Sequence, residues 1–506
     1  MHERARARFP ALAAALSFLF PGLGQAYAGQ RWIAVVMAAP ILVLLTAALV
    51  AYLILGNRMR NVVLSSPFLT ALLVLDAVLL VWRLFAIVQV GLSRPVPSPV
   101  PSRPVLATAP AGAFGPAVAA DSNGGEGSGR FLGRRPWEVA LVSLLVVITL
   151  VMHLWSGMVI ATFDGTLRQV FAGGLLGNRG GGIRQPLNQP SYHWDGTKRI
   201  TFLLLGIDSD PSRAEALTDT IIVVSIDPVA HTAVMVSVPR DTGFVPLPDR
   251  RIHADGLFPD KINALSTMAG RDPALWCPDM QSGSECGLRT LERSIGLYLG
   301  IDINYYATVN LSGFAHLIDA FGGVRLCLPG TLRDPTYSGP TWSPRRGITL
   351  PAGCQQYDGA SALAYSRIRK GTLTLPNGTV EPQDDFKRAA RQQELLLALR
   401  SQMAASNWVF ALPNILAAVS ETVSTDFPRD EAGDLASLLP LVTGPDIKRV
   451  VLGYPEFVRA PTQPLVNYLL IPRRNAIRLE AQRLFGAAGP LKGWYVGSTA
   501  SRPPAS

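Results

Sequence analysis

The sequence contains little charge for its length. Of its 506 residues only 16% are charged and 48% are hydrophobic, and the mean hydropathy is +0.25. A water-soluble protein of this size has more polar surface than such a composition provides, so an entirely soluble chain is excluded. Part of the chain must therefore contact lipid.

Lysine is absent from the first quarter of the chain. Residues 1–136 contain 12 arginines and four acids, which accounts for +8 of the formal net charge of +10. Basic proteins often bind nucleic acid, but arginines that flank apolar segments are typical of the positive-inside rule of membrane insertion. We therefore expect membrane lipid, and no nucleic acid, as a partner.

Cysteine and histidine are both scarce. No CxxC pair occurs and the six histidines lack metal-ligand spacing, which argues against a zinc site. An even number of cysteines in an oxidising compartment predicts two disulfides, with three possible connectivities. The local one, Cys277 to Cys286 and Cys327 to Cys354, closes short loops worth about 3 kcal/mol each. Four buried thiols are the alternative.

Three apolar segments are long enough to cross about 30 Å of hydrocarbon as helices. They are residues 32–55, 67–92 and 137–161. The apolar run at residues 9–27 is broken by Pro21-Gly22-Leu23-Gly24, a PGLGQ-type element, which favours a half-helix, a re-entrant or an interfacial segment. No cleavable signal peptide is expected.

Arginine placement predicts the orientation and the domain order. Arginines at residues 4–8 and again at 94–135 place both segments inside the cell, so two helices cross between them and the third leads the chain out. The prediction is a membrane region at 1–92, a disordered cytoplasmic linker at 93–136, a transmembrane helix at 137–161, an extracytoplasmic stalk at 162–198, a compact domain at 199–485 and a tail at 486–506.

Within the compact domain the hydrophobic pattern indicates an α/β fold. Short apolar runs predict strands at 200–205, 220–226, 233–238, 305–309 and 324–328. Helical spacing predicts one helix face through Leu288, Leu291, Ile295 and Leu299, and further helices at 314–321, 358–367, 386–403, 406–423 and 430–442.

Charged residues follow or precede the first three predicted strands. Asp208 follows the first, Asp219 precedes the second, and Arg240 follows the third. If the first two strands are antiparallel neighbours, both carboxylates meet at one edge of the sheet, where open α/β sheets place their sites. Two carboxylates of this kind suit Mg²⁺ held together with substrate phosphates.

A second cluster of charge lies farther along the chain. It begins with Arg367-Ile368-Arg369 and continues from Asp385 into a predicted helix. On this helix Arg388, Arg391 and Gln392 share one face, and several guanidinium groups together suit a pyrophosphate. Surface ion pairs are the alternative for any one of these arginines.

Taken in order, these segments resemble the LytR-CpsA-Psr family over residues 200–400. The resemblance lies in LLLGIDSD, TDTIIVVSIDP, VSVPRDT, KINAL, IDINYYATVNLSGFAHLIDAFGGV, ALAYSRIRK and DFKRAARQQ. It implies an extracytoplasmic three-layer α/β/α domain with a central mixed sheet, anchored in the cell membrane. It also implies an enzyme that moves a glycopolymer from a polyprenyl-pyrophosphate carrier to peptidoglycan.

The resemblance assigns roles to individual residues. Asp208 and Asp219 would bind Mg²⁺, and Asp385 would orient a group or act as base. The pyrophosphate would be held by Arg240, Arg367, Arg369, Arg388 and Gln392. Arg391 would join them, because it shares one helix face with Arg388 and Gln392. An apolar carrier also needs a groove, which the helices near 311–321 and 395–399 would line, unless their apolar faces are simply core.

The chain departs from the family pattern in two places. Where the family commonly has an arginine two residues before the second acid, this chain has Leu217, with Arg213 nearby as a possible substitute. Residues 371–384 form an insertion whose Asn377-Gly378 pair predicts a type I′ hairpin, either part of the acceptor side of the cleft or a plain surface insertion.

Two other functions use the same residues. A metal-dependent pyrophosphatase or phosphodiesterase would use water in place of a sugar hydroxyl. A non-catalytic regulator would bind the polyprenyl lipid without turning it over. The sequence does not identify the polymer.

Overall fold

The computed structural model describes residues 10–92, 136–171, 194, 196–208, 217–280, 282–405, 412–435, 438, 447–461 and 468–486. The predicted linker, most of the predicted stalk and the predicted tail lie outside these residues. The chain forms two compact units, one of residues 1–59 and 70–160 and the other of residues 60–69 and 161–506.

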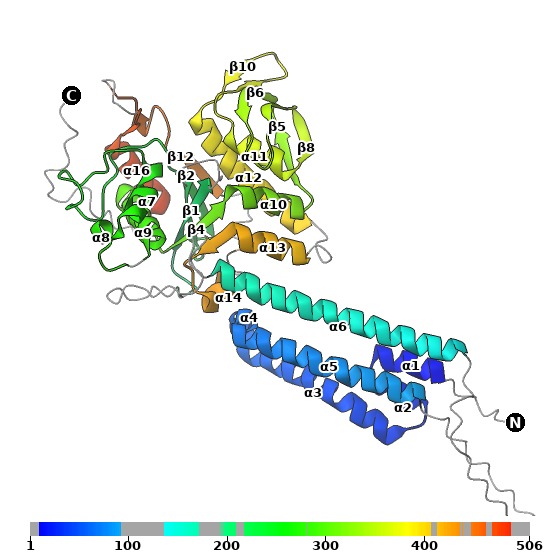
Figure 1. Ribbon diagram of the computed structural model, residues 1–506. Coiled ribbons are helices and arrows are strands. Elements are labelled where there is room, and N and C mark those ends of the chain that lie inside the picture. The colour runs from blue at the N-terminus through cyan, green and yellow to red at the C-terminus, as the bar shows by residue number, and fades with distance from the viewer. Residues whose placement is uncertain are drawn as a thin grey trace, which may run out of the picture. The chain divides into compact units, whose positions relative to one another are not determined.

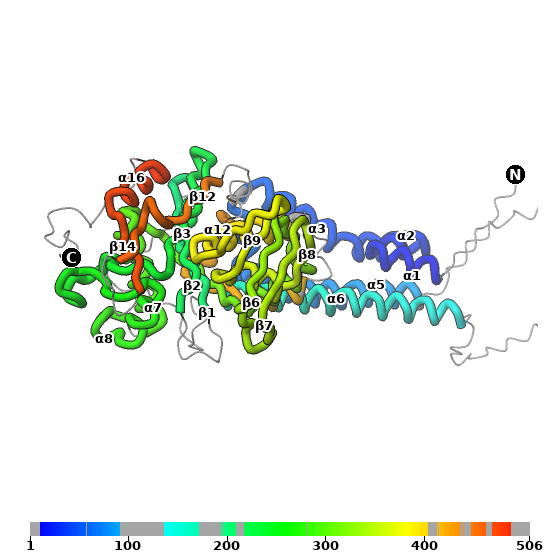
Figure 2. The backbone as a smooth tube through the Cα atoms, turned by 90° about the horizontal axis from the view of Figure 1, so that it is seen from above, coloured from blue at the N-terminus to red at the C-terminus, as the bar shows by residue number. Residues whose placement is uncertain are grey.

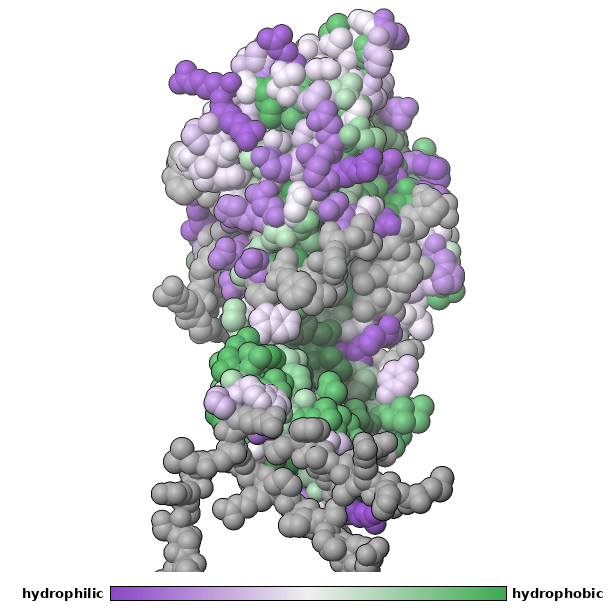
Figure 3. Space-filling view, turned by 90° about the vertical axis from the view of Figure 1, so that its right-hand side faces the viewer, coloured by the Kyte–Doolittle hydropathy of each residue, from purple (hydrophilic) through white to green (hydrophobic). Residues whose placement is uncertain are grey.

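Long apolar helices make up the first unit. α3 (Arg31–Leu55), α5 (Ser66–Leu92) and α6 (Pro136–Val170) are each long and apolar enough to cross a membrane. Their outward side chains are mainly apolar (Figure 3). These helices confirm the three predicted segments, except that α6 continues past residue 161 into the region expected to be stalk.

The first apolar run breaks into two short helices, as its Pro-Gly pair predicts. α1 (Pro10–Leu19) and α2 (Leu23–Tyr27) are separated by Gly22, whose φ is +105°. A Cβ at Gly22 would lie 2.5 Å from the backbone oxygen of Ala34, so this approach requires glycine. Buried Gln25 accepts from Ser17 Oγ at 2.9 Å and donates to Ala86 O at 3.0 Å.

A mixed six-stranded sheet forms the centre of the second unit. Its order is β11 (Val423–Thr425), β4 (Tyr305–Asn310), β1 (Ile200–Asp208), β2 (Leu217–Asp227), β3 (Thr232–Ser237) and β12 (Ile447–Val451). β1 is parallel to β4 and β3 to β12, and the other pairs are antiparallel. The sequence had predicted β1 to β4, whereas β11 and β12 are too short or too weakly patterned to predict.

Helices cover both faces of this sheet (Figure 1). One layer contains α7 (Ile262–Arg271), α9 (Gly283–Leu299) and α16 (Arg474–Phe485), and the other contains α10 (Leu311–Ala320), α11 (Gly359–Arg367), α12 (Asp385–Ala405) and α13 (Leu412–Thr422). Each layer has its own apolar core, one against Leu203, Leu205 and Val223 and one around Ile318 and Leu395. The predicted three-layer α/β/α fold is confirmed.

Short strands extend the second unit beyond the central sheet (Figure 2). β5 (Val324–Leu328) pairs with β8 (Gly353–Tyr357), and a four-stranded sheet has the order β10 (Val380–Pro382), β9 (Thr372–Thr374), β6 (Thr331–Ser338) and β7 (Arg346–Leu350). The insertion is thus the hairpin of β9 and β10.

The turn of this hairpin is of a different type from the one predicted. Gly378 N donates to Leu375 O at 2.9 Å, which closes a β-turn with Pro376 in its second position. Gly378 has a φ of +85°, but Asn377 has no positive φ, which a type I′ turn would require. Proline fixes a negative φ at the start of the turn, and this determines the turn type.

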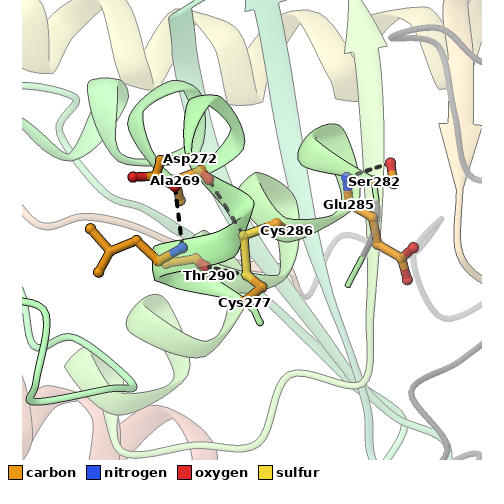
Figure 4. Close-up of a disulfide and its surroundings, with 8 residues drawn as sticks. Ala269, Asp272, Cys277, Ser282, Glu285, Cys286 and Thr290 are labelled. Atoms are coloured by element: carbon orange, nitrogen blue, oxygen red, sulfur yellow. Dashed lines mark hydrogen bonds between the residues drawn. A yellow bond between two sulfur atoms is a disulfide. The ribbon is translucent and has the colours of Figure 1, made fainter. Parts of the chain in front are cut away.

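Two disulfides have the local connectivity, which confirms that prediction. Cys277 bonds to Cys286 and Cys327 to Cys354. The first joins the end of the short helix α8 (Pro273–Trp276) to α9, where the Thr290 hydroxyl donates to Cys277 Sγ at 3.6 Å (Figure 4). The second joins opposed residues of β5 and β8.

Candidate active site

The ends of β1 and β2 bring the two predicted acids together. The strands are antiparallel, with Asp208 opposite Leu217 and Ile207 opposite Thr218. A bulge shifts the register next to Gly206, and Asp219 lies in this irregular stretch. Both acids therefore lie at the same edge of the sheet, as their order in the sequence predicts.

Each of these carboxylates pairs with an arginine from another segment. Arg367, the last residue of α11, donates from Nη2 to Asp208 Oδ2 at 2.9 Å. Arg240, which follows β3, donates from Nη1 to Asp219 Oδ1 at 2.7 Å. Three segments far apart in the sequence thus converge on one small charged site.

The start of α12 adds an acid and a third arginine. Arg388 Nη2 lies 3.1 Å from Asp385 Oδ2 and 3.2 Å from the backbone oxygen of Asp219. Arg240 Nε lies 3.7 Å from Asp385 Oδ1. Burial raises the pKa of Asp385, although Arg388 and Arg240 act in the opposite direction. A carboxylate of this kind binds a proton more readily than an exposed aspartate.

Two buried guanidinium nitrogens of the site have no hydrogen-bond acceptor among the described residues. They are Nε of Arg240 and Nε of Arg388. Burial lowers the pKa of Arg388, and Arg240 lowers it further, despite Asp385. For Arg240, burial acts to lower the pKa, but Asp219 and Asp385 raise it overall. A further anion between these arginines would find free donors and would stabilise their charge.

Arg391 makes structural contacts, and its assignment to the pyrophosphate stays a prediction. Its guanidinium donates to Tyr365 O at 2.9 Å, and also to Ile368 O and to Gln383 Oε1. Burial lowers its pKa to about 10. Helical spacing correctly places Arg391 near Arg388, but its donors are occupied in holding the segment that contains Arg367.

The remaining predicted ligands have different environments. Arg369 is exposed, and Ile368 between the two arginines is fully buried, as predicted. Arg367 is the last residue of α11, within the helix predicted at 358–367. Gln392 donates to Ser366 O at 3.3 Å, beside Arg367. Arg213 lies outside the described residues.

An apolar pocket opens next to the charged site. Its space, including the part open to solvent, is about 510 Å³, and Ser366 and Gln392 are among its polar lining residues. The helix segments predicted to line a groove contribute Leu311, Phe314, Leu395 and Leu396, and the sheet contributes Leu204, Leu205, Gly206, Thr220, Ile222 and Val309. These four helix residues line the pocket, whereas Leu317, Ile318, Phe321 and Leu399 of the same segments belong to the core.

Sequence reasoning missed Tyr337 on β6. Its side chain is buried, and its hydroxyl has no hydrogen-bond partner among the described residues. Burial raises the pKa of Tyr337, whereas Arg367 and Arg345 act to lower it. Nothing in the sequence indicates this position, because the pattern of β6 does not alternate.

Asp208 and Asp219 fit a divalent cation that also binds phosphate. They supply two oxygen donors at one edge of the sheet, and Mg²⁺ is typically held by one or two carboxylates together with substrate phosphates and water. No cluster of three or more ligating side chains occurs among the described residues. An all-protein metal cage is therefore not formed by this part of the chain.

Comparison with known proteins gives consistent matches. A profile of the LytR_cpsA_psr family matches residues 183–455. The chain is 31% identical over 229 residues to the cell wall biosynthesis protein LcpA of Corynebacterium glutamicum, covering 44% of this chain and 39% of that protein. It is 29% identical over 239 residues to the polyisoprenyl-teichoic acid–peptidoglycan teichoic acid transferase TagU of Enterococcus faecalis. This match covers 47% of this chain and 64% of TagU. The chain thus spans less than two thirds of the length of either relative.

Solved structures also match part of the chain. Bacillus subtilis TagV is 25% identical with a TM-score of 0.40, covering 57% of this chain and 97% of that one. TagT bound to LIIa-WTA is 18% identical with a TM-score of 0.40, and the match covers 60% of this chain and 95% of TagT.

Proposed function

Because the chain belongs to the LytR-CpsA-Psr family, we propose that it transfers a glycopolymer from a polyprenyl-pyrophosphate carrier to peptidoglycan. The relative TagU is named as a polyisoprenyl-teichoic acid–peptidoglycan teichoic acid transferase. The observation that supports the proposal best is the convergence of Arg240, Arg367 and Arg388 on two paired acids beside an apolar pocket.

Helix α12 arranges three parts of the proposed site in sequence. Asp385 begins the helix, Arg388 follows one turn later, and Gln392 to Leu396 line the apolar pocket. At 1.5 Å per residue the pocket residues lie about 10–16 Å from Asp385 along the axis. A carrier in the pocket would present its pyrophosphate to the arginines and its glycan to Asp385.

The reaction follows from this arrangement. The acceptor hydroxyl oxygen attacks the phosphorus that bears the glycopolymer, and a new phosphodiester bond forms. The bond between this phosphorus and the bridging oxygen breaks, and polyprenyl phosphate leaves with the electron pair. Asp385 accepts the hydroxyl proton, which finally resides on the leaving phosphate. Arg240, Arg367 and Arg388 neutralise charge on the phosphate oxygens, which supplies much of the rate in phosphoryl transfer.

Mg²⁺ is the cofactor we propose for Asp208 and Asp219. When bound, it would add positive charge at the phosphate oxygens. The arginines now paired with these acids would then be released toward the pyrophosphate, since Asp208 holds Arg367 and Asp219 holds Arg240.

We also propose that the second unit lies outside the cytoplasm. The arginine-rich segments at 4–8 and 94–135 favour this orientation, and the two disulfides suit an oxidising compartment.

A transfer assay tests the proposal. A labelled polyprenyl-pyrophosphoryl glycan is given to the detergent-purified protein with peptidoglycan and Mg²⁺. Label joined covalently to peptidoglycan supports transfer, whereas soluble product alone supports hydrolysis by the same residues. We expect Asp385→Asn to reduce transfer by about 10²- to 10⁴-fold, since it removes the base. Carrier binding by the wild-type protein without transfer or hydrolysis would instead support a non-catalytic regulator.

A further inference from the structure

Two aromatic side chains border the start of α12. Phe386 follows Asp385 directly, and its ring centroid lies 6.5 Å from that of Tyr454, with 36° between the ring planes. Tyr454 is 54% exposed, although it lies beside a buried charge cluster. More than half of Tyr454 is therefore accessible to a ligand.

Close packing fixes this pair. A Cβ at Gly453 would lie 2.9 Å from Phe386 Cδ1, so the residue before Tyr454 has to be glycine for the two segments to approach this closely. Gln393 donates to Ser237 Oγ at 2.8 Å and to Val450 O at 3.1 Å, which joins α12 to β3 and β12. The segment that contains Tyr454 is therefore held in place relative to Asp385.

Charged residues adjoin the pair in sequence and around Asp385. Arg240 Nε lies 3.7 Å from Asp385, and Lys261 Nζ lies 2.9 Å from Asp241. Glu456, two residues after Tyr454, is exposed. The carrier's proposed apolar pocket lies farther along α12, at Gln392 to Leu396. Aromatic faces among charged groups suit a pyranose ring, which has apolar C–H faces and polar hydroxyl edges, better than a lipid tail.

We propose that Phe386 and Tyr454 form a stacking surface for one sugar ring of the glycan acceptor, and that this contact holds the attacking hydroxyl beside Asp385. The inference rests on the proposed transfer reaction, and assigns its acceptor subsite. Tyrosine suits the role because it gives a large, rigid contact area at a small cost in side-chain entropy.

Substitution of Tyr454 tests this subsite in the full-length protein. The acceptor probe is a β-1,4-linked N-acetylglucosamine tetrasaccharide, whose binding is measured by NMR titration, and the carrier probe is geranylgeranyl pyrophosphate. We expect Tyr454→Ala to weaken tetrasaccharide binding, and to raise the KM for the acceptor, by about 5- to 20-fold. Carrier binding should stay within about twofold of wild type.

Two matched variants separate stacking from other effects. Tyr454→Phe keeps the ring and should retain acceptor binding. Leu479→Ala removes a side chain of α16 that is 67% exposed, and should change neither binding event.

The outcomes are distinguishable from failure of the proposed function. Tyr454-dependent tetrasaccharide binding without any transfer would support the subsite and overturn the transfer reaction. Wild-type transfer with no effect of Tyr454→Ala, or no wild-type tetrasaccharide binding, would overturn the subsite. Weaker carrier binding with unchanged tetrasaccharide binding would assign Tyr454 to the lipid and also overturn it.

Discussion

Two buried charge clusters of the second unit lie toward opposite ends of β1 and β4, and their arginines are paired differently. At the C-terminal end of β1, Arg388 contacts Asp385, and its Nε has no hydrogen-bond acceptor within the described part of the chain. Toward the other end, Arg289 lies 3.1 Å from Glu292 and 2.9 Å from Asp426, with its guanidinium over the Tyr306 ring.

The pKa values of Arg388 and Arg289 shift in opposite directions, although that of Arg240, beside Arg388, is raised like that of Arg289. Burial lowers the pKa of Arg388, and the nearby Arg240 adds to the effect. Burial also acts on Arg289, but Glu292 and Asp426 raise its pKa overall. In the first cluster three arginines face three carboxylates, and Nε of Arg240 and of Arg388 has no hydrogen-bond acceptor among the described residues. In the second cluster two carboxylates share one arginine. The first is suited to bind an anionic ligand, whereas the second is complete without one.

The largest effect should come from removing the arginine of the complete cluster. Arg289→Met leaves Glu292 and Asp426 buried without their cation, and we expect the free energy of unfolding at pH 8 to fall by about 3–5 kcal/mol. Thermal melts of the detergent-purified protein measure the loss, with the exposed Arg325→Met as control. If Arg289→Met melted at the same temperature as wild type, the second cluster would not have the structural role that distinguishes it from the first.

Removing the arginine of the incomplete cluster should affect binding more than stability. Arg388→Met loses charge-assisted contacts to the pyrophosphate worth roughly 1.5–3 kcal/mol, so affinity for geranylgeranyl pyrophosphate should fall about 10- to 100-fold. Calorimetry measures this affinity. Normal binding together with a loss of stability equal to that of Arg289→Met would show that both arginines are structural.

Particular residues show how far the sequence predicts this site. The neighbouring positions of Asp208 and Asp219 follow from two short strands in succession, which usually pair as a hairpin. The contact of Arg367 with Asp208 joins residues far apart in the chain, and only the family resemblance indicated it. Spacing on α12 placed Arg388 and Arg391 on one face, but spacing does not identify the groups opposite that face. The contacts of Arg391 with Tyr365, Ile368 and Gln383 therefore could not be predicted.

Parts of the fold escaped prediction for a related reason. β8 has four exposed residues among its five, so it lacks the alternation that identifies a half-buried strand. Its position depends on pairing with β5 and on the Cys327–Cys354 bond. Long-range pairing of this kind is not visible in a local pattern.

The smallest predicted effect is the pH dependence of the stability that Glu292 contributes to the second cluster. Burial raises the pKa of Glu292 from its usual 4.5 to about 7, despite Arg289. The folded state thus binds a proton that the unfolded chain has already released, and this contribution to stability is lost as the pH rises from about 4.5 to about 7. We expect Glu292→Gln to stabilise the protein by about 1–3 kcal/mol at pH 8 and by little at pH 4.5. Thermal melts of the wild-type protein and of Glu292→Gln at both pH values measure this effect. A stabilisation of equal size at both pH values would exclude titration of Glu292 in this range.

The disulfides have a consequence for how the chain matures. Their partners are 9 and 27 residues apart, and the two loops neither overlap nor nest. In the proposed topology the polypeptide emerges from the membrane with Cys277 and Cys286 ahead of Cys327 and Cys354. An oxidase that joins each cysteine to the next one to appear would make only native pairs. The cell that makes this protein would need no disulfide isomerase to mature it.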